Sequence, residues 1–254
     1  MSDTNTSPPA KVPSRRARAA RRAFIRSVFF GGTVVGAAML GFFPVKKAWT
    51  KRLRPPGALD EDDFLAACIK CGQCVQVCPV EAIKLGDLDE GFGVGVPFVG
   101  ARDQACDFSC DAVQCVLACP TGALTHEIDR KEQVTMGLAR VTRPNACLAR
   151  RGEGIKGTAR GTDFDGKLRY MEVDRWTPIP VTDHPYDLDL CDLCARECPI
   201  DGAITIERLN LDLSDLRGDP VVFDKCVGCG VCEMMCPVDP PAIVVVERLR
   251  YGDL

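Results

Sequence analysis

Short apolar runs recur through the second part of the chain and predict small β-strands. Residues 221–223 and 243–246 are two such runs, each with the length and the β-branched content of a short strand. Such runs lie near groups of cysteines, and each group is followed by an alanine and an aliphatic residue, at Ala82-Ile83, Ala123-Leu124, Ala203-Ile204 and Ala242-Ile243. We interpret this pattern as four copies of one unit, in the order strand, cysteine loop, short helix, strand.

A longer uncharged run lies near the N-terminus, at residues 27–45. It follows an arginine-rich segment, and a basic flank before an apolar run is typical of a targeting or anchoring segment. Its length is just sufficient to span a bilayer. The order Arg21-Arg22-Ala23-Phe24-Ile25-Arg26 is similar to the twin-arginine signal, by which folded proteins are exported. We expect residues 1–51 to be a twin-arginine-type signal or a membrane anchor; the alternative is a plain amphiphilic N-terminus with arginine pairs by chance.

The 16 cysteines fall into four sets of four, each ending in Cys-Pro. The first and last sets read C-x2-C-x2-C-x3-C-P, the run by which bacterial ferredoxins hold [4Fe–4S] clusters. The fourth cysteine of such a run ligates the neighbouring cluster, so the motifs work in pairs. The predicted ligands are Cys68, Cys71, Cys74 and Cys78; Cys106, Cys110, Cys115 and Cys119; Cys147, Cys191, Cys194 and Cys198; and Cys226, Cys229, Cys232 and Cys236.

Zinc sites and disulfides are the alternatives to iron–sulfur clusters. Zinc sites usually combine two distant C-x2-C pairs, often with histidine, and this chain has only His126 and His184. A disulfide framework does not need C-x2-C-x2-C runs followed by proline. The pattern therefore favours four [4Fe–4S] clusters. Two pairings stay open: the first set with the second and the third with the fourth, or a nested arrangement in which the first pairs with the fourth.

Two sets depart from the ferredoxin spacing. Three residues separate Cys106 from Cys110 in the second set, so we expect that loop to bulge or its cluster to sit differently. In the third set 43 residues separate Cys147 from Cys191, which makes Cys147 the least secure of the predicted ligands. The insertion at 148–190 alternates polar and apolar residues over 167–176, as a half-buried strand or hairpin arm would. It is either a docking flap for a partner or a variable surface loop.

Composition and charge limit the classes of function that the protein can have. With 254 residues the chain can form one or two compact domains, but only 6% of residues are aromatic, so we expect clusters to organise much of the interior and the apoprotein not to fold. Residues 1–57 hold 12 basic residues and one acid, a net of +11, and residues 58–254 hold 20 and 34, a net of −14. An acidic surface excludes nucleic acid and favours basic partners; the alternative is that the scattered acids only form a solvated face. No catalytic triad or carboxylate pair can be argued from spacing, which indicates an electron carrier with no catalytic residues.

Several segments resemble the NapG/MauM family of ferredoxin-type proteins over residues 45–254. They are the linker Arg-Leu-Arg-Pro-Pro-Gly-Ala-Leu at 52–59, the Ala-Arg-Asp stretch at 101–103 before Cys106, the first cysteine run and the order of the four sets, together with the arginine-pair signal. The resemblance implies a periplasmic four-cluster protein that works with a membrane NapH/MauN-like polyferredoxin, a quinol dehydrogenase. It also implies that electrons pass from quinol toward a c-type cytochrome or a periplasmic oxidoreductase.

We therefore expect an α+β fold of tandem bacterial-ferredoxin-like 2x[4Fe–4S] modules, with short strands and helices and long loops. A signal or anchor helix within residues 1–51, with residues 27–45 as the membrane anchor, would precede a four-cluster domain at 52–254, whose motifs lie at 68–79, 106–120, 147–199 and 226–237. Two other functions stay open. One is an electron-transfer subunit of a molybdopterin-type oxidoreductase, and the other is an accessory factor in maturation of a periplasmic enzyme such as methylamine dehydrogenase.

Overall fold

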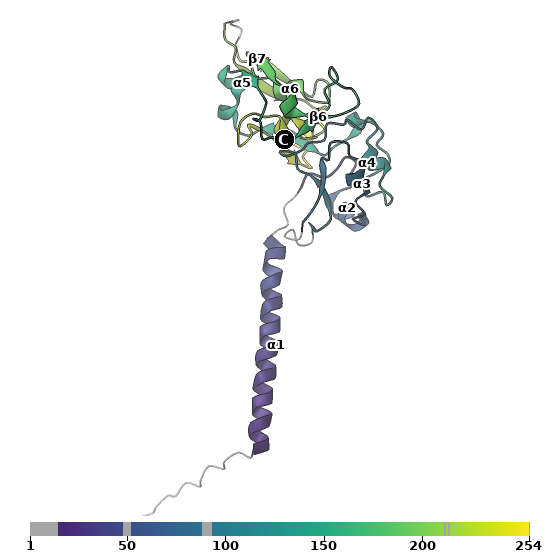
Figure 1. Cartoon of the computed structure of the whole chain (residues 1–254), viewed down its shortest axis with the longest axis vertical. Helices are drawn as coiled ribbons and strands as arrows, with labels where there is room; N and C mark the ends of the chain where they lie inside the picture. Colours follow the sequence, from purple (N-terminus) through teal and green to yellow (C-terminus); the bar gives the residue numbers. More distant parts are fainter. Residues whose placement is uncertain (1–14, 48–51, 88–92, 211, 213, 254) are drawn as a thin grey trace, which may run out of the picture. The chain divides into compact units, whose positions relative to one another are not determined.

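The computed structural model describes residues 15–47, 52–87, 93–210, 212 and 214–253. The chain divides into two compact units, one of residues 1–49 with 89–92 and one of residues 50–88 with 93–254. The described part of the smaller unit is the helix α1 (Arg15–Lys47), drawn in Figure 1. The cysteines all belong to the larger unit.

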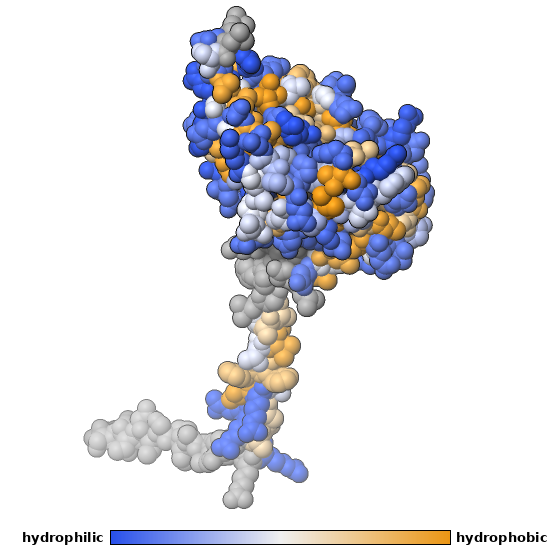
Figure 2. All heavy atoms as spheres, turned by 45° about the horizontal axis from the view of Figure 1, so that its top comes forward, coloured by the Kyte–Doolittle hydropathy of each residue, from blue (hydrophilic) through white to orange (hydrophobic). Residues whose placement is uncertain are grey.

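Helix α1 begins in the arginine-rich segment and continues through the apolar run, so the predicted N-terminal helix is confirmed. In Figure 2 its first turns are hydrophilic and hydrophobic residues follow, among them the exposed Phe24, Phe29 and Phe30. No helix within the described residues has both the length and the apolarity that a membrane crossing requires. The side chains of residues 40–47, which include the end of the predicted anchor at 27–45, lie outside the described part.

The larger unit is built from short helices placed within the cysteine sets. The helices α3, α4, α6 and α7 are one turn long, and each contains the third cysteine of its set. This arrangement confirms the short helix that the repeat predicted. The helices of this unit are α2 (Glu61–Ala67), α3 (Gln73–Gln76), α4 (Gln114–Leu117), α5 (Leu148–Arg151), α6 (Leu193–Arg196) and α7 (Val231–Met234). Short 3₁₀ turns lie at Lys131–Gln133, Pro144–Ala146, Val181–Asp183 and Tyr251–Asp253.

The strands of the larger unit pair two by two, always antiparallel. The pairs are β1 (Ile83–Leu85) with β2 (Pro97–Val99), β3 (Gly137–Val141) with β10 (Ile243–Glu247), β4 (Ile155–Gly157) with β7 (Tyr186–Leu188), β5 (Lys167–Leu168) with β6 (Ile179–Pro180), and β8 (Ile204–Arg208) with β9 (Gly218–Val222). The strands expected at 221–223 and 243–246 are thus found within β9 and β10. Mixed short helices and strands confirm the α+β class.

Two copies of the repeat differ from the predicted order. In the first, the helix α2 precedes the cysteines where a strand was expected, and in the second the alanine-aliphatic pair Ala123-Leu124 lies in no strand. Leu124 makes only an isolated bridge with Ala58 of the linker. The backbone around it is bonded to the same linker, through Leu59 N–H to Ala123 O at 3.1 Å and Thr125 N–H to Gly57 O at 2.7 Å. The linker therefore takes the hydrogen bonds that a paired strand would have used.

The insertion at 148–190 forms two small ladders. Strands β4 and β7 pair near its two ends, and β5 and β6 form the hairpin that the alternating pattern predicted. The predicted arm over 167–176 is wrong in its extent, since only Lys167 and Leu168 are extended in a ladder. The chain then turns, with the N–H groups of Val173 and Asp174 both donating to Tyr170 O at 3.0 Å.

Cysteines lie in the core of the larger unit among its buried hydrophobic side chains. The larger cluster of buried residues includes Cys74, Cys106, Cys115, Cys191 and Cys229, and a second includes Cys147, Cys232 and Cys236. In Figure 1, α3 and α4 lie on one side of this unit and α5 and α6 on another. The short elements surround the cysteines and do not form an independent core.

An ion-pair network ties the linker to the chain's end. Arg54 is 5% exposed and contacts Glu61 at 2.5 Å, while its Nη1 donates to Pro97 O at 3.0 Å. Arg248 donates to Ala58 O at 3.1 Å and to the same Glu61 carboxylate at 3.4 Å. Burial raises the pKa of Glu61, but these two arginines outweigh burial and hold that pKa below its usual range. The carboxylate therefore joins two segments far apart in the sequence.

Replacing Arg54 with methionine is expected to destabilise the larger unit. A fully buried ion pair that loses one partner costs 3–5 kcal/mol, and since the Glu61 side chain is 25% exposed we expect about 2 kcal/mol, or a melting midpoint lower by about 6 °C. Circular dichroism of the iron-loaded protein measures it. Lys84→Met is the control, because Lys84 pairs with Asp103 at the surface and its loss should cost under about 0.5 kcal/mol. Equal midpoints for the two variants would contradict the network's role.

Candidate iron–sulfur sites

Left-handed backbone conformations turn the chain before three of the four cysteine helices, α3, α4 and α7; Asp192 before α6 has φ −127°. Gly72 with φ 74° and Gly230 with φ 94° precede α3 and α7 and occupy equivalent places in the first and fourth sets. A residue without Cβ adopts this conformation at little cost. In the second set Val113 takes the position before α4 with φ 46°, a conformation unusual for a β-branched residue. The turns present three cysteines of a set on one side of the loop.

Three cavities in the larger unit are each lined by four cysteines. In every case three cysteines come from one set and the fourth is the last cysteine of another set. The groups are Cys68, Cys71, Cys74 and Cys119; Cys147, Cys191, Cys194 and Cys236; and Cys198, Cys226, Cys229 and Cys232. The remaining cavity linings are mostly apolar, for example Ala242 and Ile243 beside Cys236.

The four remaining cysteines are Cys78, Cys106, Cys110 and Cys115, and the pKa shifts of three of them indicate that they are neighbours. Burial raises the pKa of the Cys115 thiol, and the neighbouring sulfurs of Cys110 and Cys78 raise it further. Burial likewise raises the pKa of Cys106, and the neighbouring sulfur of Cys115 raises it further. Burial and the sulfur of Cys78 both raise the pKa of Cys110. This fourth group combines three cysteines of the second set with the last cysteine of the first.

The grouping decides between the two pairings that the sequence left open. Cys78 and Cys119 are exchanged between the first and second sets, which we call the N-terminal pair. Cys198 and Cys236 are exchanged between the third and fourth sets, the C-terminal pair. The nested arrangement is therefore wrong. Cys147 lies with the rest of its set despite the long insertion.

The chemistry of these groups fits a cubane cluster. Within the described residues no three His, Cys, Asp or Glu side chains converge on one point as ligands of a single metal ion would. In a cubane each thiolate binds a different iron, so the sulfurs surround a volume without meeting at a point. Four cysteines around one apolar cavity are the donor set that this geometry needs.

Burial makes the thiols hold their protons when no metal competes. Burial, with the nearby sulfurs of Cys68 and Cys71, raises the pKa of Cys74 to about 11. Burial also raises the pKa of Cys191 to about 11 and those of Cys194, Cys229 and Cys232 further. Metal binding requires the thiolate, so loading these sites releases protons.

Backbone N–H groups point at the exchanged cysteines. Ala82 N–H lies 3.3 Å from Cys78 Sγ, Leu124 N–H 3.4 Å from Cys119 Sγ and Ala242 N–H 3.3 Å from Cys236 Sγ. Burial raises the pKa of Cys119, but N–H groups, Leu124 first among them, hold it below its usual range overall. The alanines of the repeat are buried, and Ala123, Ala203 and Ala242 line cavities. The repeated alanine-aliphatic pair therefore supplies sulfur-directed hydrogen bonds and a small cavity wall.

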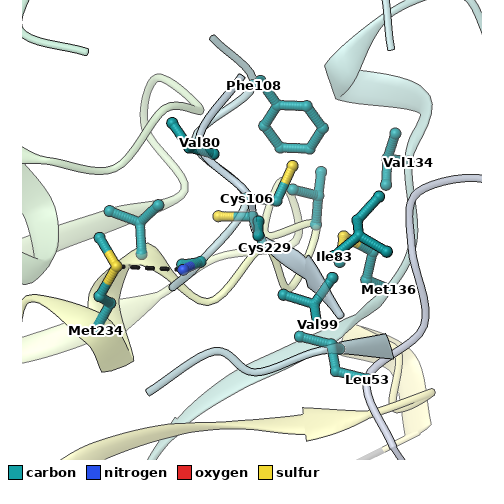
Figure 3. Close-up of a cluster of buried hydrophobic side chains, with 14 of the residues drawn as sticks. Leu53, Val80, Ile83, Val99, Cys106, Phe108, Val134, Met136, Cys229 and Met234 are labelled. Carbon is teal, nitrogen blue, oxygen red and sulfur yellow. Dashed lines mark hydrogen bonds between the residues drawn. The ribbon is translucent and has the colours of Figure 1, made fainter. Parts of the chain in front are cut away.

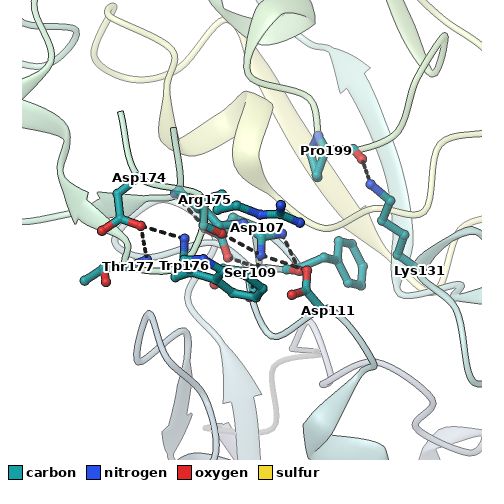
Figure 4. Close-up of polar contacts among 11 residues, drawn as sticks. Asp107, Ser109, Asp111, Lys131, Asp174, Arg175, Trp176, Thr177 and Pro199 are labelled. Atoms are coloured by element: carbon teal, nitrogen blue, oxygen red, sulfur yellow. Dashed lines mark hydrogen bonds and ion pairs between the residues drawn. The ribbon is translucent and has the colours of Figure 1, made fainter. Parts of the chain in front are cut away.

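The insertion supports the enlarged second set. Asp107, inside the three-residue gap, accepts a hydrogen bond from Arg169 N–H at 3.0 Å. The Arg169 guanidinium donates to Ser109 O at 2.9 Å, to Asp111 at 2.7 Å and to Phe108 O at 3.3 Å. Figure 4 shows Asp107, Ser109 and Asp111 beside Arg175 and Trp176 of the insertion. The two departures from the ferredoxin pattern thus meet in space, and the expected bulge is held by the inserted segment.

Sequence reasoning missed Asp107 and Arg169. The signal for Asp107 was its place in the gap with an extra residue, but nothing in the spacing pointed to an arginine 62 residues later. The two histidines do not join the cysteine groups. His126 Nε2 contacts Cys119 O at 3.0 Å, and His184 stacks on Tyr170 with ring centroids 3.8 Å apart.

Comparisons with known proteins define the class first. The family model described as a 4Fe-4S dicluster domain matches residues 67–149, and the one described as a 4Fe-4S binding domain matches residues 220–241. The protein is therefore a ferredoxin-type carrier of electrons on [4Fe–4S] clusters.

The particular family follows from the relatives. The ferredoxin-type protein NapG of Escherichia coli is 37% identical over 92% of this chain and 89% of its own length. The methylamine utilization ferredoxin-type protein MauM of Methylorubrum extorquens is 37% identical over 80% of this chain and 76% of its own length. The ferredoxin-type protein NapF of Escherichia coli is 25% identical over 73% of this chain and 80% of its own length. The chain belongs to the NapG/MauM family.

Replacing Arg169 with methionine is expected to loosen the Cys106–Cys110 loop and to lower the iron content by about one cluster per chain. Iron and acid-labile sulfide per chain measure the loss. Lys156→Met is the matched control in the same insertion, since Lys156 makes only an exposed ion pair with Asp187. Full iron in the Arg169 variant would show that the insertion does not support this set.

Removing iron is expected to unfold the larger unit, because its ladders are two-stranded and its core surrounds the cysteines. Since burial raises the pKa of Cys74 and Cys191 to about 11, protons compete with iron more strongly as the pH falls. A chelator should therefore strip iron faster at about pH 6 than at about pH 8. Circular dichroism follows the loss of structure, and absorbance follows the loss of iron. An iron-free protein with native circular dichroism would contradict the expectation.

Proposed function

We propose that this protein passes electrons through four [4Fe–4S] clusters, held by the sixteen cysteines in the four groups described above. The observation that carries the proposal is the exchange of the last cysteine between neighbouring sets, at Cys78, Cys119, Cys198 and Cys236. Such an exchange is how two-cluster ferredoxins hold clusters close together. The assignment covers all sixteen residues, including Cys147.

The chain's own residues would bind and tune these sites. A bound [4Fe–4S] cluster accepts and releases one electron. Burial of Cys106, Cys229 and Cys232 excludes water and lowers the local dielectric. The N–H groups of Ala82, Leu124 and Ala242 stabilise charge on the sulfur that each one faces. Hydrogen bonds and burial are the levers by which a protein sets the potential of such a site.

The membership in the NapG/MauM family supports a cellular location and a pair of redox partners for this carrier. The protein would be exported folded by the twin-arginine route, with the signal in residues 1–51, and would work in the periplasm at the membrane. Its electron donor would be a membrane NapH/MauN-like polyferredoxin that oxidises quinol. Its acceptor would be a c-type cytochrome or a periplasmic oxidoreductase. The acidic domain, at −14 over residues 58–254, fits basic partners.

A second candidate is an accessory role in maturation of a periplasmic enzyme. This accessory role is supported by the similarity to MauM, a relative named for methylamine utilization, which has the same 37% identity as NapG. Deletion of the gene separates the two. A lost accessory factor leaves the partner enzyme without its cofactor, whereas a lost carrier leaves a complete enzyme that is reduced or oxidised slowly.

An EPR-monitored redox titration of anaerobically purified protein, with iron counted per chain, tests the proposal. We expect about 16 irons, from four clusters of four, and at least one site that becomes paramagnetic at potentials reached by quinol. Clusters that all need much lower potentials, or far fewer irons, would overturn the quinol-linked function.

A further inference from the structure

The two pairs of cysteine sets touch at one backbone contact between cysteines. The N–H of Cys106, in the N-terminal pair, donates to the carbonyl of Cys229, in the C-terminal pair, at 3.2 Å. Both residues are buried, and Figure 3 shows them side by side. Cys106 and Cys229 belong to different groups of four, so this contact joins the loop of the second set to that of the fourth.

Neighbouring hydrogen bonds flank this contact. The N–H of Ala105, next to Cys106, lies 3.2 Å from the sulfur of Met234, the bond drawn in Figure 3. On the other side Met136 N–H donates to Val227 O at 2.9 Å. Met234 and Val227 are 0% and 4% exposed. The contact is therefore the centre of a closed, buried seam.

Two glycines permit the approach at this seam. A Cβ added to Gly230 would lie 2.6 Å from the Cβ of Ala101, and one added to Gly228 would lie 2.3 Å from Gly137 O. At the equivalent position of the first set, Gly72, the added atom would meet only a Leu85 methyl group at 4.0 Å. All three glycines have positive φ, but only at Gly228 and Gly230 of the fourth set would an added Cβ also collide with a neighbouring segment.

Arg102 clamps the seam from the side. It lies in the Ala-Arg-Asp stretch before Cys106, and its Nη1 donates to the carbonyls of Glu233 and Cys236, both at 2.8 Å. Its Nη2 donates to Val238 O at 3.0 Å. One side chain of the N-terminal pair therefore fixes the end of α7 and the last cysteine of the C-terminal pair.

We propose that electrons cross between the two pairs at the Cys106–Cys229 contact, which makes the second and fourth sets the inner sites and the first and third the outer ones. The order along the path is Cys68, Cys71, Cys74 and Cys119; then Cys78, Cys106, Cys110 and Cys115; then Cys198, Cys226, Cys229 and Cys232; then Cys147, Cys191, Cys194 and Cys236. This order differs from the order of the sets in the sequence. It rests on the proposed function.

Each crossing moves one electron. The site on the Cys106 side is oxidised by one electron and the site on the Cys229 side is reduced by one, or the reverse, with no bond broken and no proton transferred. The outer N-terminal site is open to a partner, because Cys71 is exposed and Ile69, the residue after Cys68, is 64% exposed. Of the inner cysteines, Cys106, Cys115, Cys229 and Cys232 are buried, and Cys147, Cys191 and Cys236 of the outer C-terminal site are buried as well.

The test widens the seam from either side in the iron-loaded full chain. Gly230→Ala pushes against Ala101 from the fourth set, and Ala101→Leu pushes back from outside the cysteine loops. Gly72→Ala is the matched control, with similar backbone strain in an equivalent loop but without the contact. Amide hydrogen exchange of the peptide that contains Cys106 and the EPR spectrum of the fully reduced protein are the readouts.

We expect both seam variants to weaken the protection of the Cys106 amide and to reduce the EPR broadening that arises between the pairs, while broadening within each pair persists. Gly72→Ala should keep both signals of the seam. If Gly230→Ala binds less iron than the wild type, its EPR spectrum no longer tests the seam. The Ala101→Leu variant then provides the test, because Ala101 lies outside the cysteine loops. Unchanged coupling in an Ala101→Leu protein with full iron would overturn the order alone, and a wild-type protein with far less iron than four clusters would overturn the proposed function and the order with it.

Discussion

The exchange of one cysteine between neighbouring sets is the constraint on which the rest of the larger unit depends. Its helices around the cysteines are one turn long and its ladders have two strands, so neither supplies an extended core. What the short elements share is a place beside a cysteine group. Because Cys78 and Cys119 reach across to each other's sets, neither set of the N-terminal pair is complete without the other. The same holds for Cys198 and Cys236 in the C-terminal pair.

Arginine side chains hold the loops that the cysteine groups bring close together. Arg169 binds backbone carbonyls of the enlarged second set, and Arg102 binds carbonyls within α7 and just after it. A guanidinium with several donors in a fixed fork suits this role, since each loop exposes carbonyls without partners in a helix or ladder. Arg54 and Arg248 do the same for the linker. These arginines thus add polar long-range connections to those that the exchanged cysteines make.

Local features of the fold were predictable because they depend on local spacing. The cysteine sets, the one-turn helices and the strands near 221–223 and 243–246 follow from motif and periodicity. The strand expected after Ala123-Leu124 does not form, because the linker at Gly57 and Leu59 takes its hydrogen bonds. The hairpin arm expected over 167–176 stops early, where the chain turns at Tyr170. The first error comes from hydrogen-bond partners that lie elsewhere in the chain, and the second from a local turn that the alternating pattern did not indicate.

The sequence by itself determined that cysteines would be grouped in fours, since thiolates two residues apart can wrap one corner of a cluster, and that the last cysteine of a set would serve a neighbour. It left open which neighbour. Only the tertiary structure decided the pairing, placed Cys147 with Cys191 and brought Cys106 against Cys229. The physical reason is that spacing governs what one loop can reach, whereas contacts between loops depend on where the buried backbone finds a partner and on where a missing Cβ, as at Gly230, lets two chains approach.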